Sequence, residues 1–367
     1  MQLWRSNTLN TANVLFKASR VRKDAGFSLL ELMISLVLFA VVSGTVFGLL
    51  QVARQSRSVI SENSGLNRNV RVALNLIGRD TYNAGYGYPL RNTVVLPDNR
   101  ISTLLGIPND FDTTRDTVAP IIAGNEVRPN THSTVANTRT DQITFLFKDT
   151  TFNLVGTGDA AVSQPLNINA ATTTSTGIDE IVPLSGSNAA CRVNDIYLIT
   201  GNTGSTLGVA TALSGTNRVQ FANGDVLGFN QTGTSGPLRQ ITVPASMQRV
   251  ILVTYFVTAD GTLTRREYAN RPPVLPAVAF VDQPLVYGVE NFQVQYILDD
   301  GTLTDNPSAG PNGIPGDEDD TPTNLAAVRQ IRVSISVRSI ERNAAGEPFK
   351  LSMTSTFSTR NLGYDAN

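Results

Sequence analysis

The sequence predicts an α+β protein, in which one long N-terminal α-helix packs on a β-rich globular head. Three observations predict this fold class. Residues 27–52 form an unbroken apolar run with a single acid, residues 51–80 contain no proline, and the chain after Tyr88 contains many short segments of strand character. Stretches rich in Thr, Ser and Gly separate those segments and predict insertions in the head.

The apolar run is long enough to be a transmembrane helix. Its 26 residues exceed the roughly 20 that a helix needs to cross a hydrocarbon core of about 30 Å. Fifteen Leu, Ile, Val or Phe residues lie between Leu29 and Val52, and together they favour insertion by about 5 to 9 kcal/mol. Glu31 opposes insertion by roughly 2.5 to 3.5 kcal/mol, so insertion is favoured overall. The Glu31 carboxylate either extends to the lipid headgroups or pairs with a cation.

Small residues recur along one face of this helix. Ala40, Gly44 and Gly48 follow each other at intervals of four. Such a ladder lets two helix backbones approach closely, although glycine is also simply common in membrane helices. We expect these three residues to pack against a neighbouring helix.

The helix is expected to continue beyond the membrane over residues 53–80. Val52, Val59, Leu66 and Ala73 lie seven apart, and a second series of Ser56, Asn63, Val70 and Ile77 interleaves with them. These two series form one seam along the helix. The first half of the seam is partly polar and the second half is fully apolar, so the second half is expected to dock on the head. Glycines at 78, 85 and 87 and a proline at 89 predict the end of the helix near residue 80.

The head is predicted to occupy residues 81–367 and to consist mainly of strands. Within residues 331–337, apolar side chains alternate with Arg332, Ser334 and Ser336, as in a strand with one buried face. Ala259, Asp260 and Gly261 predict a hairpin turn. Residues 154–187 and 203–237 are expected to be loops or short edge strands at the surface. The predicted strands are residues 142–148, 194–200, 218–221, 248–257, 262–268, 291–298, 328–340 and 349–356.

The junction before the apolar run has a recognisable order. A basic segment from Arg20 to Lys23 precedes Gly26, Phe27 follows, and Glu31 is the fifth residue after Gly26. This order resembles the class III leader of type IV prepilins and pseudopilins, and the fold is expected to be pilin-like. The resemblance implies that residues 1–26 are removed by prepilin peptidase, that the new N-terminal Phe27 is N-methylated, and that the helix becomes part of a fibre core.

The resemblance also implies a role for Glu31. In this family the acid sets the register of a subunit entering the fibre. A carboxylate in lipid requires a cation, and the α-amine of Phe27 on a neighbouring subunit can supply one.

Two further stretches resemble PilW-like minor pilins. The first is the Arg79-Asp80 pair followed by residues 84–86, and the second is the order of strands over residues 285–361. The resemblance implies a minor pilin that primes or caps a pilus and supports motility, adhesion or DNA uptake. Its partners would be major and minor pilins, prepilin peptidase and the inner-membrane assembly platform. Two alternatives stay open, namely a type II secretion pseudopilin and a signal-anchored periplasmic β-rich binding protein or enzyme.

Charge indicates the orientation and argues against a nucleic-acid partner. The leader carries five basic residues and one acid, which favours a cytoplasmic N-terminus and a periplasmic head before the protein reaches the pilus or cell surface. Removing these from totals of 29 and 30 leaves 24 basic and 29 acidic residues, a net charge of −5. No direct nucleic-acid binding is expected from this balance.

The head shows little sign of catalytic or metal chemistry, and the protein is not expected to be an enzyme. The single Cys191 allows no intrachain disulfide and is expected to be buried. His132 is the only histidine and is interpreted as incidental. An acidic loop is either solvated or a calcium site, since its oxygens are of the kind that Ca²⁺ prefers. The calcium candidates are Asp299, Asp300, Asp305, Asp317, Asp319 and Asp320.

Overall fold

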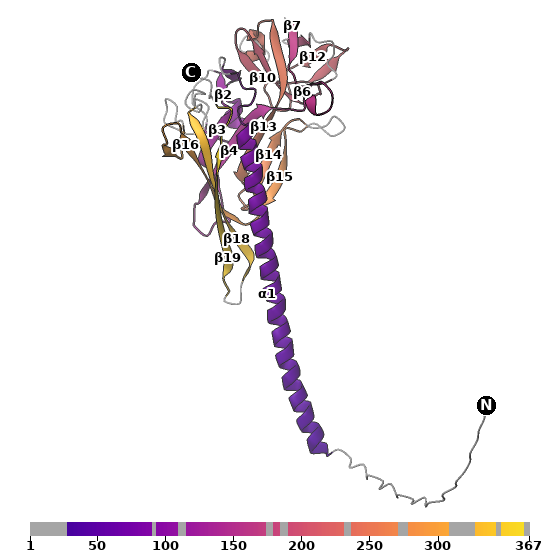
Figure 1. The fold of residues 1–367 in the computed structure, drawn as a ribbon, viewed down its shortest axis with the longest axis vertical. Coiled ribbons are helices and arrows are strands. Elements are labelled where there is room, and N and C mark those ends of the chain that lie inside the picture. Colours follow the sequence, from indigo (N-terminus) through magenta and orange to yellow (C-terminus); the bar gives the residue numbers. More distant parts are fainter. Residues whose placement is uncertain are drawn as a thin grey trace, which may run out of the picture. The chain divides into compact units, whose positions relative to one another are not determined.

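The computed structural model describes residues 28–89, 93–108, 115–173, 179–183, 190–230, 236–270, 278–307, 327–342 and 346–362. The chain divides into two compact units, Met1–Gln55 and Ser56–Asn367. Helix α1, Leu29–Asn83, contributes to both (Figure 1). The predicted fold class is confirmed, because a long apolar N-terminal helix packs against a β-rich head.

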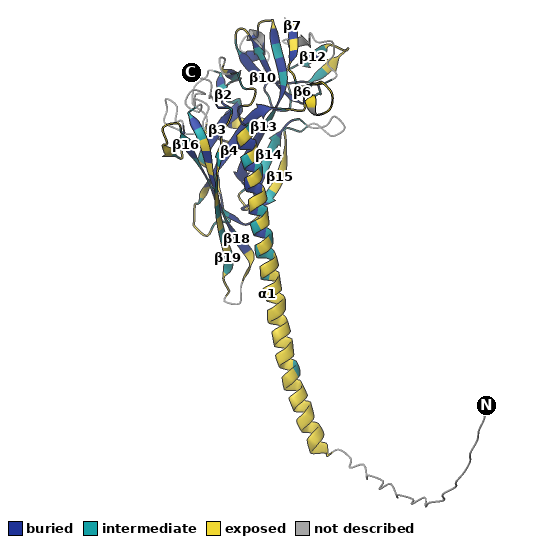
Figure 2. Ribbon diagram, in the orientation of Figure 1, coloured by how far each residue is buried: buried dark blue, intermediate teal, exposed yellow. Residues whose placement is uncertain are grey.

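The described part of the first unit is the N-terminal half of α1. Its residues are almost all exposed, as the mainly yellow ribbon in Figure 2 shows. Leucine, valine and phenylalanine side chains make up most of this surface. The described residues of this unit therefore form a helix with no core of its own.

The second unit contains two large sheets. One has 13 strands and the other has the four strands ordered β17-β16-β18-β19. The strands of the larger sheet are β1 (Val94–Leu96), β2 (Asp116–Val118), β3 (Ile121–Pro129), β4 (Arg139–Lys148), β7 (Leu166–Thr173), β8 (Asp179–Pro183), β9 (Ile196–Gly201), β10 (Ser205–Val209), β11 (Ala212–Ser214), β12 (Arg218–Phe221), β13 (Ala245–Val257), β14 (Leu263–Tyr268) and β15 (Phe280–Val286). Those of the smaller sheet are β16 (Val289–Leu298), β17 (Leu303–Thr304), β18 (Val328–Arg342) and β19 (Pro348–Ser358).

Short elements complete the described residues. They are helix α2 (Arg100–Leu105), the 3-10 helices η1 (Gly158–Ala160) and η2 (Pro237–Gln240), and a two-stranded sheet of β5 (Leu154–Val155) and β6 (Val162–Ser163).

Strand β13 organises the larger sheet because two different sets of strands pair with its two halves. Its first half pairs antiparallel with β7 and β9, and its second half pairs antiparallel with β4 and β14. The 13-residue length of β13 makes this possible. One strand thereby connects the part of the sheet next to α1 with the part formed by β7 to β12.

The C-terminal half of α1 completes the largest hydrophobic core. Leu66, Val70, Ala73 and Ile77 are buried in one cluster that also contains side chains from β4, β13, β16 and β18. The predicted docking of the later seam is confirmed, whereas Val52 and Ser56 of the earlier seam are exposed. A second cluster lies around β9, β10 and α2, and a third contains the buried Cys191, as predicted.

All eight predicted strands are present, with ends shifted by a few residues at most. Two predictions need correction. Helix α1 continues to Asn83, three residues beyond the predicted end, because a single glycine such as Gly78 weakens a helix by only about 1 kcal/mol. Gly78 packs closely against the Phe357 ring. Residues 154–187 and 203–237 are not only surface insertions, because each contains a strand in the interior of the sheet. Strand β7 pairs with β8 and β13, and strand β10 pairs with β1 and β9 and is fully buried.

Candidate assembly site on helix α1

The first turn of α1 places Glu31 at the start of the exposed half of the helix. The Ser28 carbonyl accepts a hydrogen bond from the Leu32 amide at 3.1 Å. Glu31 is the acid in this turn and its side chain is exposed. An acid here is favoured by the partial positive charge at a helix N-terminus. Gly26 and Phe27 lie outside the described residues, so the predicted cleavage and methylation positions are placed by sequence alone.

The exposed half of α1 needs an apolar environment. Leu29, Phe39 and Phe47 are each more than 70% exposed, and large apolar residues surround them on every side of the helix. A continuous apolar surface of this kind is far larger than the patches that soluble monomers tolerate. The helix is long and apolar enough to cross a membrane. Two of its hydroxyls are satisfied within the helix, because Ser35 and Thr45 donate to the carbonyls of Leu32 and Val42.

The small-residue ladder is accessible on this surface. A methyl group added at Gly44 or Gly48 would meet no atom within 4 Å. Ala40 is exposed in the same segment. The predicted close approach of another helix at these three residues stays a prediction.

A comparison with known families decides how this helix is interpreted. Residues 21–47 match the family described as the prokaryotic N-terminal methylation motif. The chain therefore carries a class III prepilin leader and is type IV pilin-like or pseudopilin-like. The motif implies processing by prepilin peptidase and assembly with pilins, and it is consistent with anchoring in the inner membrane before assembly.

The methylation motif ends at residue 47, before the helix enters the head. Neither a curated protein nor a solved structure matches the chain. The roles of residues in the head are therefore inferred from their contacts alone.

A buried carboxylate fastens the end of α1 to the larger sheet. Asp80 is 1% exposed and accepts hydrogen bonds from the Tyr255 hydroxyl at 2.7 Å and from Arg265 Nε at 3.1 Å. Arg79 on the same helix turn pairs with its other oxygen at 3.0 Å. Arg265 also pairs with Glu267 at 2.8 Å. Both oxygens of the buried acid are thus satisfied by cations or a hydroxyl, as burial of a charge requires.

The ionisation of the groups around Asp80 follows from this arrangement. Burial, and then the Asp80 carboxylate, raise the pKa of the Tyr255 hydroxyl, which stays protonated as a donor. Burial alone would lower the pKa of Arg265, but Asp80, Glu267 and Tyr255 together outweigh this effect and raise it. Arg79 and Asp80 were singled out from the sequence, but the structural role of Asp80 depends on residues about 175 to 185 positions away.

A second acid of α1 holds the β18–β19 hairpin. The Glu62 carboxylate accepts the Ile340 amide at 2.8 Å on one oxygen and the Glu341 amide at 3.0 Å on the other. These two amides lie at the end of β18, where strand pairing with β19 becomes irregular. Glu62 therefore supplies acceptors that the ladder does not provide there.

The C-terminal residues of the described chain return to the end of α1. Gly85 adopts φ +77°, and a side chain there would collide with Leu362. Asn361 donates to the Tyr82 carbonyl at 3.0 Å. Glycine is required at 85 because the backbone is left-handed and closely approached. The end of α1 and the residues that follow β19 are joined in this way.

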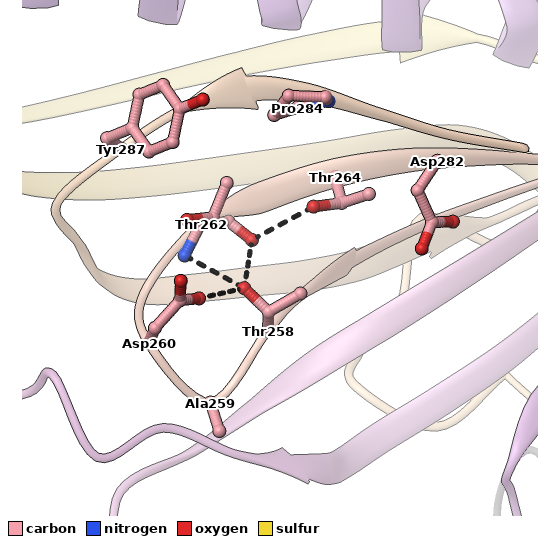
Figure 3. Close-up of a pocket in the computed structure, with 8 residues that line it drawn as sticks. All are labelled: Thr258, Ala259, Asp260, Thr262, Thr264, Asp282, Pro284 and Tyr287. Carbon is pink, nitrogen blue, oxygen red and sulfur yellow. Dashed lines mark hydrogen bonds between the residues drawn. The ribbon is translucent and has the colours of Figure 1, made fainter.

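A groove opens at the tip of the β13–β14 hairpin, where the predicted turn at Ala259–Gly261 is confirmed (Figure 3). It has a volume of about 550 Å³. Its two carboxylates are already engaged: Asp260 accepts from Thr258, and Asp282 pairs with Arg266 at 2.7 Å. The groove therefore presents no free acid–base pair. Its lining residues are Thr258, Ala259, Asp260, Thr262, Thr264, Asp282, Pro284 and Tyr287.

The calcium candidates are only partly described. Asp299 lies 3.9 Å from Arg329, and Asp300 accepts the Thr302 amide at 2.8 Å, which lowers the pKa of Asp300. Asp305 is described, whereas Asp317, Asp319 and Asp320 lie outside the described residues. No group of three or more His, Cys, Asp or Glu side chains within the described part of the chain is arranged to hold a metal ion. Calcium binding stays a prediction.

Proposed function

We propose that the protein is a minor type IV pilin of the PilW-like kind, which joins other minor pilins to prime or cap a pilus. The observation that carries the proposal is the methylation motif at residues 21–47 on a helix whose other half completes the core of a large β-rich head. The helix would insert the subunit, and the head would supply a specialised surface. Pilus-dependent motility, adhesion or DNA uptake would then depend on it.

In this proposal the chain is held in the inner membrane with its N-terminus in the cytoplasm and its head in the periplasm. Prepilin peptidase cuts between Gly26 and Phe27, and Phe27 is methylated. Glu31 then pairs with the α-amine of a neighbouring subunit as the helix leaves the lipid for the fibre. The role is structural and not enzymatic.

The N-terminus of the mature chain tests the first step. The full chain is expressed with and without prepilin peptidase, and the mass of its N-terminal peptide is measured. We expect a peptide that begins with methylated Phe27 only when the peptidase is present. A mature terminus at any other residue would refute the pilin and pseudopilin interpretations together.

Replacement of Glu31 tests the second step. Glu31→Ala is expected to leave membrane insertion intact, since it removes an unfavourable charge, but to block entry into sheared fibres. Leu29→Ala is a suitable control because it changes a neighbouring residue without removing the carboxylate. Normal amounts of the Glu31→Ala chain in fibres would contradict the assigned role.

A pseudopilin of a type II secretion system is the second candidate, because the methylation motif serves both classes. Deleting the gene separates them. A pilin deletion reduces surface piliation, whereas a pseudopilin deletion leaves secreted enzymes inside the cell envelope.

A further inference from the structure

The outer face of α1 within the second unit is a strip of arginines. Arg57, Arg68, Arg71 and Arg79 follow each other at intervals of eleven, three and eight residues. At 3.6 residues per turn, these intervals place all four within an arc of about 80°, over a length of about 33 Å. All four are exposed. We call these four residues the arginine strip.

The arginine strip lies opposite the buried face of the helix. Leu66 and Ile77, which pack into the core, lie about 180° from the strip on the same helical turns. Figure 2 shows exposed and buried residues alternating along this half of α1. The strip therefore faces away from the core of its own head.

The acids of this half of α1 do not neutralise most of the strip. Glu62 and Asp80 are the only acids between residues 56 and 83, and both lie towards the head. Glu62 is occupied by two backbone amides of β18, and Asp80 by Tyr255, Arg265 and the neighbouring Arg79. Like charges three residues apart, as at Arg68 and Arg71, repel each other on a helix surface. A like-charged pair of this kind destabilises the helix slightly, and an anionic partner would remove this cost.

Apolar residues beside the strip favour a protein as the partner. Ile60 and Val72 flank the arginines and are 67% and 50% exposed. The face between the arginines carries Ser61, Ser64 and Asn75, which are small enough for close approach. Arginine together with exposed apolar side chains is typical of protein–protein interfaces, whereas nucleic-acid sites add stacked aromatic residues.

We propose that the arginine strip docks on the carboxylate-rich surface of a neighbouring pilin-type subunit. This inference rests on the proposed function, because the strip continues along the same helix that carries the methylation motif. Guanidinium groups bind carboxylates in pairs of parallel hydrogen bonds, so the strip would set the axial position of the neighbour as well as attract it.

Site-specific crosslinking in cells tests this. A photoreactive benzophenone residue replaces Ser64, between Arg57 and Arg68, in the full chain. The same residue at Thr354, on the exposed face of β19, is the positional control. We expect the Ser64 probe to give an adduct whose second protein has its own methylated N-terminal residue, and the Thr354 probe to give at least fivefold less of it.

Charge reversal then tests the arginines themselves. Arg68→Glu/Arg71→Glu should reduce the Ser64 adduct at least fivefold. The matched control Arg332→Glu/Lys350→Glu makes the same charge change on exposed positions of β18 and β19 and should leave the yield within twofold. Unchanged urea unfolding midpoints would establish that both variants fold, and Arg57→Glu provides a second variant if the double one does not.

The results separate this inference from the function on which it rests. If Phe27 is methylated and the chain enters fibres, but the Ser64 adduct is absent or insensitive to Arg68→Glu/Arg71→Glu, the strip has no pilin partner and the inference is wrong. An adduct that nuclease removes, or one to lipid alone, would also overturn it. A chain that is never processed at Gly26 would refute the pilin function itself.

Discussion

The Asp80 carboxylate of α1 accepts a hydrogen bond from Arg265 Nε of β14 at 3.1 Å, across 185 residues of sequence. Asp80 is 1% exposed and the Arg265 side chain is 11% exposed, so water does not compete strongly for either charge. The Tyr255 hydroxyl binds the same oxygen of Asp80. Asp80, Arg265 and Tyr255 together add a polar contact to the hydrophobic contact between α1 and the sheet.

Asp80→Asn should destabilise the head by about 2 to 4 kcal/mol, because it leaves the buried Arg265 with Glu267 as its remaining acid partner. Tyr255→Phe removes one hydrogen bond and should cost about 1 kcal/mol. Arg79→Gln should cost less than about 0.5 kcal/mol, since Arg79 is largely exposed. Urea unfolding of the full chain in detergent would measure all three. A cost for Arg79→Gln equal to that of Asp80→Asn would contradict the assignment of Arg265 as the important partner.

Gly78 and Gly65 form a matched pair on the same helix. A methyl group at Gly78 would lie 2.5 Å from the Phe357 ring, whereas one at Gly65 meets nothing within 4 Å. We expect Gly78→Ala to destabilise the protein by about 1 to 3 kcal/mol through overpacking. Gly65→Ala should stabilise it by up to about 1 kcal/mol, because alanine is the better helix former. If the thermal unfolding midpoints of both variants shift in the same direction, Gly78 and Gly65 do not differ in packing as the structure indicates.

Asp141 should make the stability of the head depend on pH. Its two oxygens accept the amides of Glu126 and Val294, which joins β3 to β16. Burial raises the pKa of Asp141 to about 6 despite those hydrogen bonds, compared with 3.8 in an unfolded chain. The native state therefore binds more protons than the unfolded state between about pH 4 and 6. The contribution of Asp141 is fully present below about pH 4 and is lost as the pH rises through 6, by up to about 3 kcal/mol.

Asp141→Asn isolates this effect because asparagine does not titrate. The free energy of unfolding is measured for both proteins between pH 4 and 7. We expect the native protein to lose stability relative to the variant as the pH rises, on top of a constant offset from the altered hydrogen bonds. Two parallel curves would show that Asp141 titrates at an ordinary pH.

Glu62→Gln tests the hold of α1 on the β18–β19 hairpin. Glutamine keeps one acceptor oxygen, so one of the Ile340 and Glu341 amides loses its partner, at a cost of about 1 kcal/mol. Hydrogen exchange at the end of β18 should accelerate about fivefold, while exchange in the middle of β18 stays unchanged. Glu341→Gln, whose exposed side chain lies next to the same amides, serves as the control. Equal exchange rates in the native and Glu62→Gln proteins would mean that the end of the β18–β19 hairpin does not depend on Glu62 for its stability.

Local patterns were enough to predict α1, its buried seam and eight of the strands. Leu66, Val70 and Ile77 repeat at helical intervals, and alternation in β18 shows which residues face the core. Strand β15 was missed because Pro284 interrupts it. This proline is tolerated because, among the described strands, β15 pairs with β14 alone. Strand β10 was missed because its Ser, Thr and Gly residues lack a strand pattern, although neighbouring strands bury all of them.

The site was predictable where it depends on order along the chain and not where it depends on distant partners. The spacing of Gly26, Phe27 and Glu31 was sufficient for the methylation motif. The position of Arg79 and Asp80 was visible, but no local pattern indicates that Tyr255 and Arg265 complete the pair. For the same reason, the sequence alone could not show that Glu62 binds amides almost 280 residues away.

Helix α1 forms both the exposed apolar segment and part of the core of the head, so the position of a proteolytic cut in α1 decides whether the released head stays folded. Five buried residues of α1, from Leu66 to Ile77, belong to the core of the head. A protease that cuts before Leu66 releases a head with its core complete. A cut after Ile77 removes those side chains and leaves apolar surfaces of both sheets open to water, so the released fragment unfolds. A folded head that is free of the membrane therefore retains the C-terminal part of α1, from Leu66 onward.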